Sequence, residues 1–210
     1  LGRGMLRAAL LQIRYVSAEG LVVSGGGPTV KNVSGFDIPR LMVGALGTFG
    51  LLGEAIIRTN PIPPVSRWLH AKECDPGLVQ DTLLAPSVVL WNGTSAWIQI
   101  EGHGADVDAQ QATLADLGDF AEVDCSADAL PVDLPAHRWS LAPNEVAGLV
   151  RDSTFSSGDF VAAAGLGLVF TNHPQPPRDV SPEVALVAAR LKENFDPTGR
   201  LNPGRDANHR

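Results

Sequence analysis

The residues best suited to chemistry lie in a glycine-rich segment, residues 25–53, rather than in a cluster of acids, histidines or cysteines. Gly44, Gly47 and Gly50 are spaced three apart in the stretch GALGTFG. Glycine lets the backbone turn with positive φ and approach another group closely, and free N–H groups in such a turn bind phosphate or a heteroaromatic edge. On spacing alone two interpretations stay open, a ligand-binding turn or turns that only permit tight packing.

The segment does not fit the two common nucleotide-binding patterns. A Rossmann fingerprint needs a different glycine spacing and a helix directly after it, and a P-loop needs Gly-Lys followed by Ser or Thr. The five histidines include no pair at a metal-ligand spacing, and Cys74 and Cys125 form no CxxC motif. We therefore expect no metal site, and the sequence by itself identifies no catalytic residue.

The elements that must position the glycines can be predicted from local patterns. Strands are predicted over 11–16 and 21–23 as a hairpin, over 51–59, twice within 86–102 with a turn at Asn92-Gly93, over 120–123, and once or twice within 160–170. Helices are predicted over 37–45, 105–117, 143–151 and 181–195.

Two of the predicted helices carry an apolar face. In the helix over 105–117 the face is Val107, Leu114 and Leu117. In the helix over 181–195, which Ser181 can cap and Pro182 can open, the face is Val184, Val187, Ala188, Leu191 and Phe195.

Composition is that of a globular protein, with 44% hydrophobic and 19% charged residues. The net charge of −7 argues against a nucleic-acid partner, and no apolar run reaches the roughly 18 residues of a membrane span. An acidic middle lies between two mildly basic ends, with proline-rich breaks at 60–64 and 174–177. We therefore expect the ends to fold together and the middle to form a separate unit.

Two motifs near opposite ends of the chain match one known pattern. The first is KNVSGFD at 31–37 with Leu41 and GALGTFG at 44–50, and the second is FDPTGRLNPGR at 195–205. In this order they resemble the KNVAGYD…L…GS.GTLG block and the closing FDP.G.LNPGR of FAD-linked oxidases of the vanillyl-alcohol-oxidase type, the PCMH fold. Within that family the chain looks most like the FAD-binding subunit of bacterial glycolate oxidase.

The resemblance implies an α+β fold, with the C-terminal part of a PCMH-type FAD-binding domain and a ferredoxin-like α/β cap domain. Residues 1–63 would be the second part of the FAD-binding domain, 64–180 the cap domain, and 181–210 a C-terminal helix and tail returning to the FAD-binding domain. The implied cofactor is FAD. The residues implied to bind it are Lys31, Asn32, Gly35, Asp37, Gly44, Gly47, Thr48, Gly50 and Asn202.

Three of these residues have alternative interpretations that stay open. Asp37 either orients the 31–37 loop or caps the helix that follows. Asn202 either approaches the flavin ring or is a turn residue before Pro203. Lys31 either lies near the flavin or its phosphates or is a surface lysine.

The resemblance also implies an activity and partners. An FAD-dependent oxidoreductase of this type would oxidise a 2-hydroxy acid, glycolate to glyoxylate, and pass electrons from its flavin to an iron–sulfur subunit beside a second FAD subunit. The alternative is a non-catalytic structural subunit that docks to a catalytic FAD subunit and an iron–sulfur protein. We expect either to be cytoplasmic and to reach the inner face of the membrane only through partners.

The family's Gly-rich loop that cradles the FAD diphosphate would precede Leu1, the first residue. We therefore expect an N-terminally truncated fragment that binds FAD poorly and is inactive by itself. We also expect the motif at 195–205 to contact the segment 31–50, because in the family both belong to one flavin site.

Overall fold

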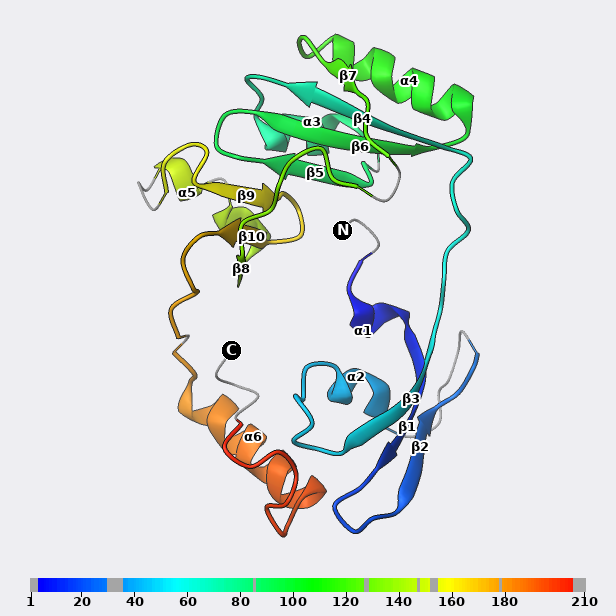
Figure 1. Cartoon of the computed structure of the whole chain (residues 1–210), viewed down its shortest axis with the longest axis vertical. Coiled ribbons are helices and arrows are strands. Elements are labelled where there is room, and N and C mark those ends of the chain that lie inside the picture. Colours follow the sequence, from blue (N-terminus) through cyan, green and yellow to red (C-terminus); the bar gives the residue numbers. More distant parts are fainter. Residues whose placement is uncertain are drawn as a thin grey trace. The chain divides into compact units, whose positions relative to one another are not determined.

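The structure is a computed structural model of the chain, and it describes residues 4–29, 36–84, 86–126, 129–146, 148–151, 155–177 and 179–205. The chain folds into two compact units (Figure 1). The seven-stranded unit is formed by Pro61–Gln175. The three-stranded unit combines the segment Gly4–Asn60 with the described residues from Pro176 onward, so two segments far apart in the sequence belong to one unit.

The seven-stranded unit is built on one antiparallel sheet. Its strands are β4 (Val65–Ala71), β5 (Val88–Trp91), β6 (Ala96–Gly102), β7 (Ala121–Val123), β8 (His137–Ser140), β9 (Phe160–Ala163) and β10 (Leu168–Thr171). Its helices are α3 (Pro76–Thr82), α4 (Gly104–Ala115), the short 3₁₀ helix η1 (Pro143–Glu145) and α5 (Gly148–Arg151). The strand order is β7-β4-β6-β5-β9-β10-β8. The first four strands and α3 and α4 follow the β-α-β-β-α-β order of a ferredoxin-like unit, which the other three strands extend.

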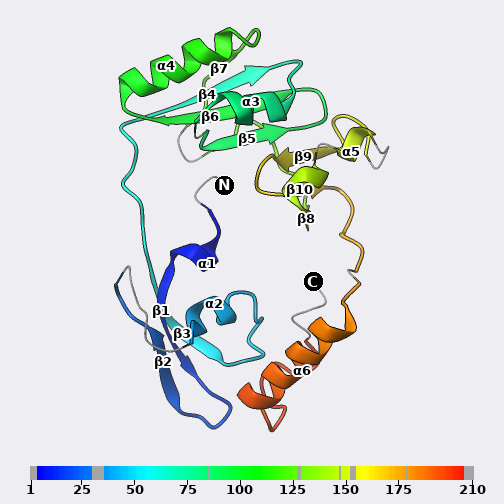
Figure 2. The same ribbon diagram turned by 180° about the vertical axis from the view of Figure 1, so that it is seen from behind.

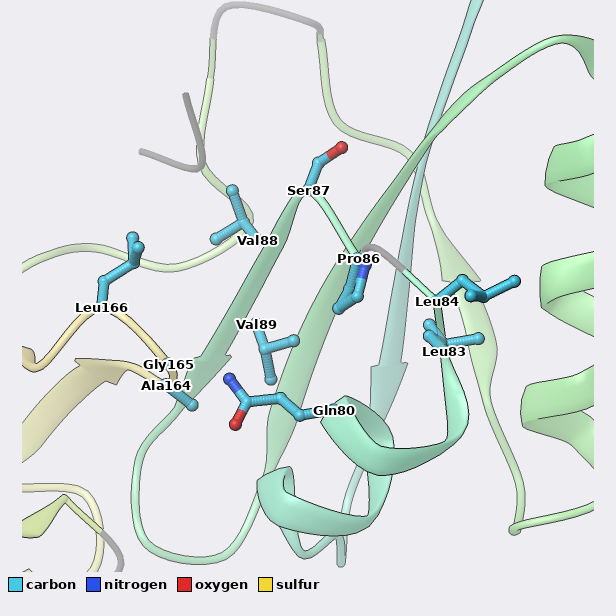
Figure 3. A pocket seen from close by; sticks show the side chains of 10 residues that line it. All are labelled: Gln80, Leu83, Leu84, Pro86, Ser87, Val88, Val89, Ala164, Gly165 and Leu166. Carbon is cyan, nitrogen blue, oxygen red and sulfur yellow. The ribbon is translucent and has the colours of Figure 1, made fainter. Parts of the chain in front are cut away.

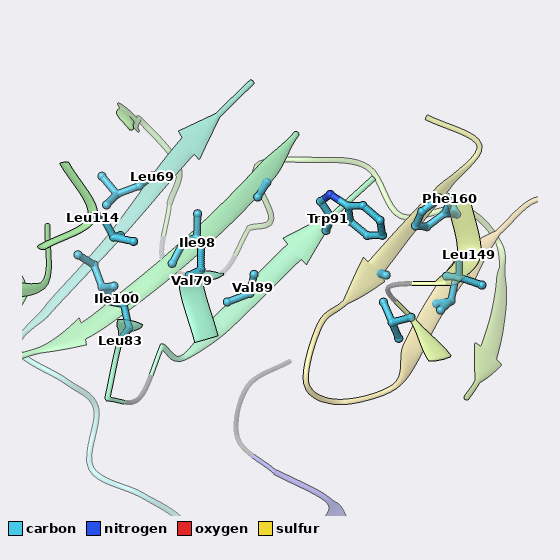
Figure 4. Close-up of a cluster of buried hydrophobic side chains, with 14 of the residues drawn as sticks. Leu69, Val79, Leu83, Val89, Trp91, Ile98, Ile100, Leu114, Leu149 and Phe160 are labelled. Carbon is cyan, nitrogen blue, oxygen red and sulfur yellow. The ribbon is translucent and has the colours of Figure 1, made fainter. Parts of the chain in front are cut away.

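One face of this sheet is covered by the helices. Leu69, Ile98 and Ile100 point from the strands toward Val79 of α3 and Leu114 of α4, and all five side chains are buried (Figure 4). Helices that bury an apolar stripe against a sheet are the usual way such a layer is stabilised. The main core of the unit therefore lies between the sheet and its helices.

The opposite face of the sheet carries a second cluster. Successive side chains of a strand alternate between faces, so Trp68 and Leu90 lie on this side. Val132 and Leu134 pack on them from the segment after β7, which crosses the sheet in Figure 1, whereas Figure 2 shows α3 on the other side. The sheet is thus covered by helices on one face and by an irregular segment on the other.

The three-stranded unit is smaller and more open. Its elements are α1 (Leu6–Ala9), β1 (Leu10–Val16), β2 (Val22–Gly26), α2 (Ile38–Met42), β3 (Leu51–Ile57) and α6 (Pro182–Phe195). The strand order is β2-β1-β3, all antiparallel, and α2 packs on β1 and β2. Gly26, with φ of 81°, permits this packing, because a Cβ there would overlap the carbonyl oxygen of Leu11 and the ring of Pro39.

Several predicted elements are confirmed where local chemistry is strong. The hairpin of β1 and β2 is present, and β5 and β6 turn at Asn92, whose Oδ1 accepts from the N–H groups of Thr94 (3.1 Å) and Ser95 (2.8 Å). The helix predicted from Ser181 starts at Pro182, with the Ser181 hydroxyl accepting from the Val184 N–H. Residues 160–170 form two short strands rather than one bent strand.

Three predicted helices are shorter than expected. α2 ends at Met42 because Val43 is extended and Gly44 has a positive φ. α4 ends at Ala115, so Leu117 lies beyond it and is 42% exposed. The stretch 143–151 is not one helix but η1 followed by α5.

The apolar stripe of α6 is largely exposed. No residue of α6 is buried, and Val184 and Val187 are 54% and 56% exposed. Leu191 and Phe195 are half-buried, because α6 contacts the rest of its unit through its C-terminal end. An apolar period predicts a helix and its preferred face, but only packing shows whether anything covers that face.

Candidate functional site

The GALGTFG stretch folds into a tight turn after α2, which we call the glycine turn (residues 44–50). Thr48 N–H donates to the Ala45 carbonyl (2.9 Å), closing a β-turn whose central residues Leu46 and Gly47 have φ of 53° and 75°. Positive φ at both central positions is the pattern of a type I′ turn. Gly44 has a φ of 85°, so both it and Gly47 are explained by backbone conformation.

The last glycine of the stretch has a different role. Gly50 lies against the buried ring of Tyr15, and a Cβ on Gly50 would overlap that ring and approach the Met42 side chain to 3.1 Å. Thr48, itself buried, donates from Oγ1 to the Ala45 carbonyl at 2.6 Å. These contacts fix the base of the turn, so packing alone accounts for Gly50.

The top of the glycine turn offers backbone donors. Leu46 and Gly47 are exposed, and their N–H groups have no acceptor among the described residues. A Cβ on Gly47 would meet only Asn202, at 3.7 Å. Exposed N–H groups at a turn with positive φ are suited to bind an anionic or polar heteroaromatic group.

Three side chains of the C-terminal segment hold this turn, and we call them the C-terminal clamp: Lys192, Asp196 and Asn202. Lys192 Nζ donates to the carbonyls of Thr48 (2.9 Å) and Leu201 (3.0 Å) and to Asp196 Oδ2 (2.6 Å). An ammonium has three N–H bonds, so all three are satisfied. Asn202 Nδ2 donates to the Leu46 carbonyl.

Asp196 is the buried member of the clamp. Its carboxylate accepts from Lys192 and from the N–H groups of Arg200 (3.0 Å) and Leu201 (2.8 Å), with Thr198 Oγ1 at 3.3 Å. Burial by itself would raise the pKa of Asp196, but the hydrogen bonds from Lys192 and from the two amides outweigh it and hold the pKa well below its usual range. Asp196 is therefore ionised at any physiological pH.

The expected contact between the two motifs is present within the described residues. Besides the clamp, the rings of Phe49 and Phe195 pack with centroids 5.2 Å apart. Of the residues predicted to bind FAD, the structure brings together Gly44, Gly47, Thr48, Gly50 and Asn202. Lys31, Asn32 and Gly35 lie outside the described residues.

Asp37 has a structural role at the start of α2. Its Oδ1 accepts from the Arg40 N–H (3.2 Å), and its other carboxylate oxygen pairs with the Arg40 side chain (3.1 Å). Sequence reasoning missed Lys192 and Asp196 as site residues. A signal existed, because Lys192 is one of three lysines and stands four positions before the motif's Asp196 on a predicted helix.

The seven-stranded unit contains a separate pocket of about 310 Å³ between the end of α3 and the β9–β10 turn (Figure 3). Its polar side chains are Gln80 and Ser87, and the rest of its lining is apolar or glycine. No charged side chain lines it, so it does not suit a small carboxylic acid. It carries no part of the site described above.

The described residues include other groups that could take part in chemistry. Burial, followed by the carboxylate of Asp75, raises the pKa of the Cys74 thiol, which is therefore not an activated nucleophile. Within the described ranges, no three His, Cys, Asp or Glu side chains gather where they could hold a metal ion. No helix in the described part of the chain is long and apolar enough to cross a bilayer.

The sequence of the chain is similar to those of several known proteins. Glycolate oxidase subunit GlcE of Escherichia coli (strain K12) is 27% identical over 246 aligned residues, covering 96% of this chain and 66% of GlcE. Glycolate oxidase subunit GlcD of Bacillus subtilis (strain 168) is 37% identical over 68 residues, which cover 32% of this chain and 14% of GlcD. The chain is therefore similar in sequence to two glycolate oxidase subunits. D-lactate dehydrogenase of Archaeoglobus fulgidus is 38% identical over 58 residues, or 28% of this chain and 13% of that enzyme.

The solved structures agree on the fold. An alkyldihydroxyacetonephosphate synthase matches with a TM-score of 0.59 at 13% identity, covering 96% of this chain and 54% of the synthase chain. The resemblance to FAD-linked oxidases of the PCMH type and the α+β fold it implied are therefore confirmed. The chain spans 66% or less of the length of the proteins it matches, and no family model matches it.

Proposed function

We propose that this chain is part of an FAD-dependent oxidoreductase that oxidises a 2-hydroxy acid, with glycolate as substrate and glyoxylate as product. The observation that carries the proposal is the similarity to glycolate oxidase subunit GlcE along 96% of the chain. The similarity to a D-lactate dehydrogenase supports the same substrate class, since glycolate and lactate both carry a hydroxyl beside a carboxylate.

The backbone N–H donors of the glycine turn are suited to bind FAD. Leu46 and Gly47 present exposed N–H groups without an acceptor among the described residues, and Gly47 adds no side chain in front of them. Asn202 and Thr48 fix the turn that carries these donors. The residues we assign to FAD binding are Lys31, Asn32, Gly35, Asp37, Gly44, Gly47, Thr48, Gly50 and Asn202.

When bound, FAD would supply the acceptor for the hydride that leaves the α-carbon of the hydroxy acid. In this proposal the chain binds and orients FAD. The backbone N–H groups of the glycine turn donate to it, and the C-terminal clamp keeps those groups in place. In this proposal residues 1–63 and 181–210 belong to the FAD-binding domain. Residues 64–180 are the cap domain.

We further propose that the chain works in a complex with a second FAD subunit and an iron–sulfur subunit that takes electrons from the flavin. Similarity to two differently named glycolate oxidase subunits, GlcE and GlcD, supports an enzyme made of several related chains. The cytoplasm, at the inner face of the membrane, is the proposed location of such a complex.

The first test uses the complete natural protein, purified together with its flavin and iron–sulfur partners. We expect FAD to be released on denaturation. We also expect glycolate to bleach the flavin absorbance under anaerobic conditions faster than D-lactate or D-2-hydroxyglutarate does. A complex that binds FAD but is reduced by none of the three acids would contradict the proposed substrate class.

The second test assigns a flavin to this chain rather than to its partner. Gly47→Glu places a carboxylate beside the donors of the glycine turn, so the complex should assemble with less FAD per complex. Gly104→Glu is the matched control, because nothing lies within 4 Å of a Cβ on Gly104. Full FAD content and turnover in Gly47→Glu would favour the alternative of a non-catalytic structural subunit.

A titration tests the expectation that residues 1–210 alone bind FAD weakly. A diphosphate is held by several N–H donors or cations, and each missing charge-assisted bond weakens binding by about 1.5–3 kcal/mol. Fluorescence quenching compares these residues with the same chain extended by its natural upstream sequence. Equally tight binding by both would show that the glycine turn holds FAD unaided.

A further inference from the structure

The glycine turn is strained at a residue that is not glycine. Leu46 has a φ of 53°, a conformation in which Cβ crowds the backbone of any L-residue other than glycine. The Leu46 side chain is 42% exposed, so hydrophobic burial does little to hold it there. Strained backbone persists only where surrounding contacts fix it, and such positions gather at ligand sites.

The contacts that fix it come from the C-terminal clamp. Asn202 donates to the carbonyl of Leu46, and Lys192 donates to the carbonyl of Thr48. Both bonds join residues more than 140 positions apart in sequence. The turn is therefore braced at two of its carbonyls by another part of the chain.

Because a peptide unit is planar, the bond to the Leu46 carbonyl also sets the direction of the Gly47 N–H. The carbonyl of Leu46 and the N–H of Gly47 belong to one peptide unit, and no peptide bond among the described residues is cis. In a trans unit the two groups point in opposite directions. When Asn202 holds the Leu46 oxygen, the Gly47 N–H must point away from the clamp, and it is one of the two exposed donors of the turn.

Asp196 and Lys192 keep Asn202 in reach. The Asp196 carboxylate accepts the amides of Arg200 and Leu201, and Lys192 also binds the Leu201 carbonyl. Leu201 directly precedes Asn202, which itself has a φ of 42°. The position of the asparagine amide is thus set by a hydrogen-bonded ion pair in which Asp196 is buried and Lys192 is partly exposed.

We infer that Lys192, Asp196 and Asn202 are positioning residues that lock the Leu46–Gly47 peptide, so that the Gly47 N–H faces the bound cofactor. The inference rests on the proposed function, because the ligand it names is FAD. Without the clamp the peptide is free to rotate, which would turn the Leu46 carbonyl toward the cofactor and replace a donor with an acceptor.

The test uses two variants of the complete flavoprotein. Lys192→Met keeps the aliphatic stem and removes all three donors. Asn202→Gly removes the amide without strain, since glycine adopts positive φ freely. We expect each to weaken FAD binding by roughly 5- to 150-fold, the usual range of coupling between linked sites. Within residues 46–50 and without FAD, we also expect faster amide hydrogen exchange at Thr48, whose N–H donates to the Ala45 carbonyl.

Two controls separate positioning from loss of stability. Arg190→Met removes a positive charge from an exposed position on the same helix, and Arg190 makes no hydrogen bond or ion pair with the described residues. Ile13→Val trims the buried core of the same unit without touching the clamp. Both should keep the FAD affinity and the exchange rate at Thr48, although Ile13→Val lowers the stability of the unit.

Unchanged FAD affinity and exchange in Lys192→Met and Asn202→Gly would overturn the inference. So would an Ile13→Val variant that loses as much affinity as they do, because the effect would then follow stability alone. If the wild-type protein binds no FAD, the proposed function fails. The exchange measurement still decides whether the clamp holds the turn.

Discussion

The seven-stranded unit holds its sheet between two apolar clusters, whereas the three-stranded unit holds its key turn with hydrogen bonds to backbone carbonyls. Among the described residues, the buried side chains of the three-stranded unit include Ile13, Tyr15 and Phe49 but also the polar Thr48 and Asp196. In the described part of the other unit, many aliphatic and aromatic side chains are buried, and the one buried polar side chain is Thr171.

The contrast shows two ways of specifying structure. Hydrophobic burial is non-directional and tolerates repacking, so it is suited to hold a scaffold together. Hydrogen bonds to carbonyls are directional, so they are suited to set the orientation of one peptide unit. The three-stranded unit leaves Leu51 and Leu52 of β3 and Val187 of α6 more than half exposed, and it depends correspondingly more on its polar contacts.

The largest expected effect is in the apolar core. Phe160 is fully buried and packs against the rings of Trp91 and Phe155, so Phe160→Ala should destabilise the seven-stranded unit by about 3–5 kcal/mol. All four tryptophans lie in that unit, so tryptophan fluorescence during urea unfolding measures it selectively. Leu84→Ala, at a fully exposed position of the same unit, should change stability by less than about 0.5 kcal/mol. An equal loss in both variants would refute the assignment of the core.

The next effect concerns space beneath the glycine turn. Gly50→Ala forces a Cβ into the ring of Tyr15 and should destabilise the three-stranded unit by about 1–3 kcal/mol. Tryptophan fluorescence should report no change, and hydrogen exchange of β1 amides should report the loss. If the fluorescence transition shifts as well, the two units do not unfold independently and the comparison fails.

A smaller effect is expected where only backbone conformation is at issue. Gly47→Ala meets no close atom but must adopt a φ of 75°, which costs about 1–2 kcal/mol. Gly104→Ala, with open space and no positive φ, should be neutral or stabilising by up to about 1 kcal/mol. Urea unfolding measures the stability of both variants. Hydrogen exchange of the β1 amides monitors unfolding in Gly47→Ala, and tryptophan fluorescence monitors it in Gly104→Ala. Similar losses at the two positions would contradict the backbone explanation.

The smallest effect near neutral pH is the pH dependence of the contribution of Asp196 to stability. Its pKa is lowered in the folded state, so its ionised form stabilises the fold fully above the pKa of the unfolded chain. That contribution is lost as the pH falls through the lower folded-state pKa. The stability difference between wild type and Asp196→Asn should stay constant from about pH 8 to 5 and shrink below about pH 4. Exchange of β1 amides across this range measures it, and a difference that already shrinks above pH 5 would contradict the assignment.

Much of the local structure was predictable because its causes are local. Asn92-Gly93 specifies a tight turn between two apolar runs, and Ser181 with Pro182 specifies a helix start, whatever lies around them. The strand β4 was not predicted, because both faces of a central strand are buried and its sequence shows no clean alternation. The start of α3 carried a readable signal, Asp75 capping a helix that begins at Pro76, which the sequence analysis did not use.

The candidate site, too, combines features with local causes and features that depend on long-range contacts. The sequence by itself determined that Gly44, Gly47 and Gly50 form a turn and that a second motif near the C-terminus belongs with it. Only the tertiary structure decided that Gly50 makes room for Tyr15, that the apolar face of α6 stays exposed, and that Lys192 binds Thr48. Turn and helix-cap preferences depend on residues that are only a few positions apart in the sequence. A hydrogen bond between residues 144 positions apart exists only once folding has brought the two segments together.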